Sequence, residues 1–155
     1  MKPGTFTQLH IQLVFAVKYR ECLLHKSQRE ELFKYASGIV ENKKCKNIII
    51  NGFSDHIHIF TGLNPAISIA DLVHDIKISL STFINQDKKW FHRKFAWQDG
   101  YGAFSYSHSQ VQDVYKYILN QESHHQKRPF REEYLDFLKK FGVEYDERFL
   151  FEFFE

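Results

Sequence analysis

The stretch TQLHIQLVFAV at residues 7–17 places an apolar side chain at every second position. Successive side chains of a strand point to opposite faces of a sheet, so a period of two predicts a half-buried strand. The residues on its apolar face are Leu9, Ile11, Leu13, Phe15 and Val17. The strand ends at the basic sequence Lys18-Tyr19-Arg20.

Working outward from this strand, the apolar spacing predicts the order strand, helix, strand, strand, helix, strand, followed by C-terminal helices. We expect a helix capped by Ser27 and Glu30 that runs to about Lys43, strands at 47–51 and 56–60 around a turn near Gly52, a helix over 67–86, strands near 95–97 and 103–106, and helices at about 109–125 and 131–140. This order is typical of an α+β ferredoxin-like sandwich, in which an antiparallel sheet carries helices on one face. We expect residues 1–155 to form a single domain.

The net charge of +2 conceals an uneven distribution. Residues 1–142 carry 20 basic against 14 acidic side chains, whereas the tail from Val143 holds five acids and one base. A basic body can attract a polyanion, and the aromatic content of 17% is compatible with stacking on unpaired bases. The two cysteines and the absence of a signal-like or membrane-spanning pattern lead us to expect a cytoplasmic protein without a membrane partner.

His56 and His58 lie two residues apart in a predicted strand, so both side chains leave the same face of the sheet. Two imidazoles separated by about 7 Å of backbone can converge on one metal ion. Asp55 can orient one of these ligands through a hydrogen bond from the second coordination shell. The alternative is a pair of histidines on a polar sheet face without a metal. The pair does not extend into the longer histidine and aspartate motif of metallo-hydrolases, because Ile59, Phe60 and Thr61 follow it.

The helix predicted over 109–125 adds a nucleophile to this pair. We expect its buried stripe to contain Val111, Val114, Tyr115 and Ile118. Tyr117 lies at the edge of the stripe, and Gln121 lies beside it one turn later. The phenol of a tyrosine has a pKa near 10 and needs a polarised target. A divalent ion held by two imidazoles and the oxygen of Gln121 can polarise a phosphodiester, and this ligand set fits Mg²⁺ or Mn²⁺.

Five segments, in this order, carry a resemblance to a known family. They are Lys18-Tyr19-Arg20, Asp55-His56-Ile57-His58-Ile59, Trp97-Gln98-Asp99-Gly100-Tyr101-Gly102-Ala103-Phe104-Ser105, Tyr117-Ile118-Leu119-Asn120-Gln121 with the trailing Glu122-Ser123-His124-His125, and Phe130-Arg131-Glu132-Glu133-Tyr134. Over nearly the whole chain the sequence resembles the HUH single-tyrosine transposases of small bacterial insertion sequences, relatives of the REP-associated tyrosine transposases.

The resemblance implies a metal-dependent DNA transposase that cleaves and rejoins single-stranded DNA at the ends of an insertion sequence. His56, His58 and Gln121 would be the metal ligands, and Tyr117 would take the 5′ phosphate and free a 3′ hydroxyl. It also implies hairpin or single-stranded DNA as partner, a bacterial cytoplasmic protein associated with the nucleoid when bound, and a homodimer in which the tyrosine helix of one subunit completes the histidine pair of the other.

For several other residues the sequence allows both a functional and a purely structural interpretation. Lys77 can face DNA or be a solvated lysine, and Lys18 and Arg20 can meet phosphates or simply face solvent. Tyr101 can stack on a base, whereas for Trp97 core packing is the simpler expectation. His124 and His125 suggest a metal role but fit a helix C-terminus better, where positive charge is favourable.

Two rival functions remain. A ferredoxin-like sheet with exposed aromatic residues can be a non-catalytic module that binds single-stranded nucleic acid. The histidine pair can also serve a small metallo-hydrolase that forms no covalent intermediate. Loss of cleavage with retained binding in Tyr117→Phe distinguishes the transposase from both.

Overall fold

A computed structural model describes residues 3–154 of the chain. Its elements are β1 (His10–Ala16), α1 (Lys26–Asn42), β2 (Lys46–Phe53), β3 (His56–Gly62), α2 (Ile69–Thr82), β4 (Gly102–Tyr106), α3 (Val111–Leu119), α4 (Gln121–Lys127) and α5 (Phe130–Lys140). Short 3-10 turns occupy Arg20–Cys22, His108–Gln110 and Glu147–Phe149, and a π-helical turn, Phe83–Lys88, follows α2.

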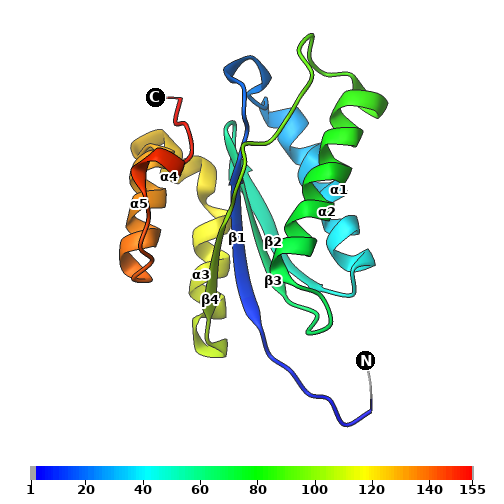
Figure 1. Cartoon of the computed structure of the whole chain (residues 1–155), viewed down its shortest axis with the longest axis vertical. Helices are drawn as coiled ribbons and strands as arrows, with labels where there is room; N and C mark the ends of the chain where they lie inside the picture. Colours follow the sequence, from blue (N-terminus) through cyan, green and yellow to red (C-terminus); the bar gives the residue numbers. More distant parts are fainter. Residues whose placement is uncertain (1–2, 155) are drawn as a thin grey trace.

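The four strands form one antiparallel sheet in the order β2-β3-β1-β4. The helices α1 and α2 cover one face, and α3, α4 and α5 lie on the other (Figure 1). This arrangement confirms the α+β ferredoxin-like fold with additional C-terminal helices.

Alternation along the central strands divides the sheet into an apolar face and a face that carries the polar groups. Leu13 and Phe15 of β1 are fully buried, and Phe15 lies under the ammonium group of Lys77 from α2. The other face carries Gln12, which bonds to His58 of the neighbouring strand. Apolar burial against α1 and α2 therefore fixes which face receives the histidines.

The histidine face is covered rather than exposed. His56 and His58 have no accessible surface, because the C-terminal helices pack over them. The polar sheet face that carries the two histidines is therefore not open to solvent. The buried imidazoles must find partners inside the protein.

Several local predictions differ from the structure. The cap of α1 is His25, paired with Gln28, rather than Ser27 with Glu30. The residues near Trp97 form only an isolated bridge to Val17, because the segment meets the sheet at a single point. Tyr115 is 40% exposed and does not belong to the buried stripe of its helix.

The helix expected over 109–125 consists of three pieces. A 3-10 turn precedes α3, and α3 ends at Leu119 before α4 begins at Gln121. The helix breaks at Asn120, and Gln121 and His125 of the following helix contact the His56 ring. Among residues 3–154, no helix has the length and apolar character needed to cross a bilayer.

Candidate active site

The hairpin between β2 and β3 places the histidines. His56 and His58 pair across the sheet with Ala16 and Val14 of β1, so their positions are fixed on both sides. Asp55, in the turn of the hairpin, lies 2.7 Å from Nδ1 of His56 through its Oδ1 atom. This carboxylate is the second-sphere partner that we expected, and it holds the orientation of the His56 ring.

The end of α3 is tied to the same hairpin. The side-chain amide of Asn51 donates hydrogen bonds of 3.0 and 3.1 Å to the carbonyl oxygens of Ile118 and Leu119. Ile118 is fully buried against the sheet, and Tyr117 is half-buried beside it. The tyrosine helix therefore packs on the sheet of its own chain, with the Tyr117 ring stacked on His124 at 4.6 Å.

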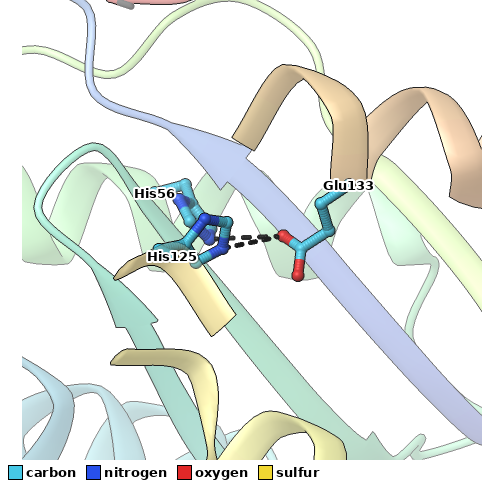
Figure 2. Close-up of side chains that lie close together, drawn as sticks. All are labelled: His56, His125 and Glu133. Carbon is cyan, nitrogen blue, oxygen red and sulfur yellow. Dashed lines mark hydrogen bonds and ion pairs between the residues drawn. The ribbon is translucent and has the colours of Figure 1, made fainter. Parts of the chain in front are cut away.

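Glu133 of α5 lies at the centre of the histidines. Its Oε1 atom is 3.1 Å from Nε2 of His58, 3.2 Å from Nε2 of His125 and 3.5 Å from Nε2 of His56. Figure 2 shows the rings of His56 and His125 directed at this carboxylate from β3 and α4. Its second oxygen, Oε2, accepts hydrogen bonds from the Tyr117 hydroxyl and, at 2.9 Å, from the Gln121 amide.

Gln121 turns its carbonyl oxygen toward the imidazoles. This oxygen lies 3.1 Å from Nε2 of His56 and 3.0 Å from Nε2 of His125. Gln121 has no exposed surface, so its amide is held by these contacts and by the donation to Glu133. The structure thus brings Tyr117, Gln121, His56 and His58 together around one buried carboxylate.

In two of the rings, the hydrogen bond at Nδ1 determines whether Nε2 carries a proton or a lone pair. Nδ1 of His56 faces the Asp55 carboxylate, and Nδ1 of His125 lies 2.9 Å from the carbonyl oxygen of Arg128, so both Nδ1 atoms act as donors. A neutral imidazole with a proton on Nδ1 carries a lone pair on Nε2. Both lone pairs then point at oxygens of Gln121 and Glu133, which also carry lone pairs. Two lone pairs that face each other repel, so a proton or a metal cation between the nitrogen and the oxygen is needed to make the contact favourable.

The third ring has a polar support on the sheet. Nδ1 of His58 lies 2.8 Å from Nε2 of Gln12, and the Tyr106 hydroxyl donates to Oε1 of Gln12 at 2.7 Å. In this arrangement His58 carries its proton on Nε2 and donates it to Glu133. A half-turn of the Gln12 amide would exchange its oxygen and nitrogen and leave the lone pair on Nε2, which is the form that binds metals.

The buried charges shift the pKa values of the site. Burial opposes ionisation of Glu133, but the nearby imidazoles of His58, His125 and His56 hold the pKa of this carboxyl well below its usual range. Burial alone would lower the pKa of His56, and the Asp55 carboxylate more than offsets it, so the pKa is raised. Burial lowers the pKa of His58, against the opposing charge of Glu133.

The nucleophile candidate is kept protonated by its surroundings. Burial and then the negative charge of Glu133 raise the pKa of Tyr117 far above its ordinary value. The side chain also lines a cavity of about 430 Å³, together with the basic residues Arg128 and Lys140 and the acidic residues Asp113, Glu133 and Asp136.

The residues that we considered for DNA contacts lie elsewhere. Lys77 donates to the carbonyl oxygens of Gln98 and Gly100 at 2.9 and 2.7 Å, so its ammonium group anchors that loop, and burial lowers its pKa. Lys18 and Arg20 are exposed, and Tyr101 is 37% exposed. None of these four side chains lines the cavity beside Tyr117.

Three residues of the site escaped the sequence analysis. Glu133 is an acid within the buried stripe that Phe130 and Phe137 define on α5, and such an interruption is a usable signal. Gln12 gives a similar signal, since it is a polar residue inside an apolar strand. We assigned His125 to a helix C-terminus, which is where it lies, but its ring also reaches Glu133.

A comparison with models of known protein families shows to which family the chain belongs. The model of the family described as "Transposase IS200 like" matches residues 5–121, which is about three quarters of the sequence. The chain belongs to the IS200-like transposase family. The matched segment of this transposase ends at Gln121, so it contains His56, His58 and Tyr117 but neither His125 nor Glu133. No curated protein sequence matches it significantly.

Two solved structures share the fold of this transposase. One is a protein from Deinococcus radiodurans R1 assigned as a transposase, with a TM-score of 0.58, 21% identity and coverage of 78% of this chain and 96% of the other. The second is a REP-associated tyrosine transposase bound to a REP hairpin, with a TM-score of 0.58, 12% identity and coverage of 81% and 74%. Both likenesses support the α+β architecture.

Proposed function

We propose that this transposase cleaves and rejoins single-stranded DNA at insertion-sequence ends, with Tyr117 as nucleophile and a divalent cation at the histidine pair. The observation that carries the proposal is the convergence of Tyr117, His56, His58 and Gln121 on one buried site from two distant parts of the chain. A module that only binds nucleic acid has no need to connect a tyrosine hydroxyl to two buried imidazoles.

The donor set fits a divalent cation. Such ions bind nitrogen and oxygen at about 2.0–2.2 Å, so neighbouring ligands on one ion lie about 3.0–3.5 Å apart. The contact of 3.1 Å between Nε2 of His56 and the Gln121 oxygen falls in this range, and Nε2 of His58 and of His56 reach the same Glu133 oxygen at 3.1 and 3.5 Å. Held by His56, His58 and Gln121, a Mg²⁺ or Mn²⁺ ion would supply positive charge that polarises the scissile phosphate.

The residues of the chain then have distinct tasks. Asp55 orients His56, and Gln12 supports His58. The Tyr117 oxygen forms a bond to phosphorus, and the bond from phosphorus to the 3′ oxygen breaks, which leaves a 5′-phosphotyrosine and a 3′ hydroxyl. The hydrogen bond to Oε2 of Glu133 positions the Tyr117 hydroxyl, whose proton passes to water, and the departing 3′ oxygen takes a proton from water.

The proposed partner is single-stranded or hairpin DNA. The solved relative with the same fold binds a REP hairpin, and the cavity beside Tyr117 opens next to the proposed nucleophile. Unpaired DNA can follow such a cavity, whereas a stiff duplex cannot bring one phosphate to a half-buried tyrosine.

The proposed assembly is a homodimer that exchanges the tyrosine helix. In the described chain α3 packs on its own β2, joined to β4 by Ser107 and a single 3-10 turn. The same contacts would form between two chains if α3 were exchanged, so exchange costs little. Complementation tests this part: a mixture of His56→Ala and Tyr117→Phe chains regains activity if sites are shared and stays inactive if each chain is self-sufficient.

A denaturing gel tests the proposed chemistry. Labelled single-stranded element ends are incubated with the protein and Mn²⁺, and a covalent protein–DNA adduct is expected for the wild type. Tyr117→Phe should form no adduct yet still bind DNA. Tyr115→Phe is the matched control, because Tyr115 is an exposed phenol on the same helix and should behave like the wild type. An adduct that persists in Tyr117→Phe would refute the assignment.

A further inference from the structure

Among residues 3–154, one group of metal-ligating side chains is tight enough to hold an ion, and it differs from the histidine pair and glutamine of the proposed site. The group is His56, His125 and Glu133, whose ligand atoms all lie within 4.8 Å of one another. His58 is outside this group, but its Nε2 atom lies 3.1 Å from the same Oε1 atom of Glu133. His125 and Glu133 come from α4 and α5, beyond the segment that matches the family model. The C-terminal helices thus bring ligand atoms of their own to the buried pair.

We propose that His125 and Glu133 are direct ligands of the divalent cation, which is then held by three imidazoles and one carboxylate. The inference rests on the proposed metal-dependent function and extends its ligand set. An octahedral ion has six positions, so four such ligands leave two for the Gln121 oxygen and a phosphate oxygen.

The side-chain contacts support this set over a structural role. Glu133 is only 2% exposed and has three imidazole nitrogens around a single oxygen, an arrangement that neutral hydrogen bonding does not require. The His125 ring is fixed by the Arg128 carbonyl, with its Nε2 directed into the site. Carbonyl support at one nitrogen and a metal at the other is a common arrangement for a histidine ligand.

The ligand set determines which cation the site prefers. Imidazole favours first-row transition ions, whereas Mg²⁺ prefers oxygen ligands and keeps several waters. Three imidazoles in a buried site therefore select Mn²⁺ or Zn²⁺ over Mg²⁺. A pair of imidazoles with an amide oxygen would discriminate less.

Metal binding and metal spectroscopy test the inference without any activity measurement. The affinity for Mn²⁺ is measured from the spin-resonance signal of the free ion, with Mg²⁺ as competitor. Glu133→Gln and His125→Gln should each weaken Mn²⁺ binding by more than about 100-fold, because loss of a residue that only supports a ligand already costs about 10–100-fold. Glu132→Gln, an exposed neighbour on α5, and His92→Gln, an exposed histidine, are matched controls that should bind as the wild type does.

X-ray absorption of the Zn²⁺ form of the wild type counts its imidazole ligands, which keeps the test valid if Glu133→Gln fails to fold. Three imidazoles in the wild type and two in His125→Gln are expected. Two imidazoles in the wild type, or unchanged or tighter Mn²⁺ binding in Glu133→Gln, would overturn the inference, since the carboxylate would then compete with the ion. If the wild type binds neither ion, the proposed function is overturned as well. If His56→Ala loses binding while His125→Gln and Glu133→Gln keep it, only the wider ligand set is overturned.

Discussion

The hydroxyl of Tyr117 donates a hydrogen bond to Oε2 of Glu133, and the other oxygen of the same carboxylate faces His58. One side chain from α5 thus joins the tyrosine of α3 to the histidine pair of β3. Without a cation, burial and the negative charge of Glu133 keep the pKa of Tyr117 high and the phenol protonated. A cation at the imidazoles would offset that charge, which couples metal binding to the readiness of the nucleophile.

Replacement of either sheet histidine should abolish cleavage and also weaken the fold. Both rings are fully buried, and their Nε2 atoms contact Gln121 and Glu133 respectively. Loss of one partner from a buried polar network costs about 1–3 kcal/mol of unfolding free energy. Thermal unfolding and the cleavage assay together check this, with exposed His92→Ala as control. Full activity without metal in either variant would contradict the assignment.

Gly52→Ala should destabilise the hairpin that carries His56. A Cβ atom at this position would lie 2.3 Å from the carbonyl oxygen of His56, and neither backbone can move without disturbing the sheet. We expect a loss of at least about 1–3 kcal/mol, as for other forced overpacking, together with reduced cleavage. Gly38→Ala in α1 is the control: its Cβ meets nothing within 4 Å, and the change should stabilise the helix by about 0.5–1 kcal/mol. Chemical denaturation of the two variants should therefore shift in opposite directions.

Binding should favour hairpin or single-stranded DNA over plain duplex and weaken as salt rises. Phosphate contacts release counterions, so the logarithm of the affinity falls linearly with the logarithm of the salt concentration. Fluorescence anisotropy with the three DNA forms at several salt concentrations measures both effects. Equal affinity for duplex at physiological salt would count against the proposed partner.

Alkaline pH should destabilise the protein through Tyr134. Burial raises the pKa of Tyr134 to about 12, above the ordinary value of 10.0. Between these values the unfolded chain releases a proton that the folded chain retains, so stability is lost as pH rises from 10 toward 12. A shift of this size corresponds to at most about 3 kcal/mol. Tyr134→Phe should lose less stability over this range in unfolding experiments at pH 9 to 12, and an unchanged pH slope would show that another group is responsible.

The alternation of apolar residues along the strands gave the most reliable structural predictions. The period of two in β1 and β3 predicted both the sheet and the common direction of His56 and His58, because burial of one face determines the register. Helix boundaries were less certain: His25 competes with Ser27 as a cap, and Asn120 breaks a pattern that reads as one helix.

The role of α5 could not be predicted from local pattern. Glu133 reaches His58 across 75 residues of sequence, and only the packing of the C-terminal helices against the sheet brings the two together. The sequence predicted a helix at about 131–140, but it did not show which residues Glu133 would contact. The prediction that Tyr115 belongs to the buried stripe was wrong for a different reason: a nine-residue helix allows more than one apolar stripe.

Mass spectrometry of the protein–DNA adduct tests the central claim most directly. Trypsin cuts after Lys116 and Lys127, so Tyr117 falls in the peptide 117–127, whereas Tyr115 falls in the preceding one. After nuclease digestion of the adduct, the account predicts a nucleotide joined through its 5′ phosphate to Tyr117. A nucleotide on the peptide that ends at Lys116, a link through a 3′ phosphate, or cleaved DNA with no modified peptide would contradict it.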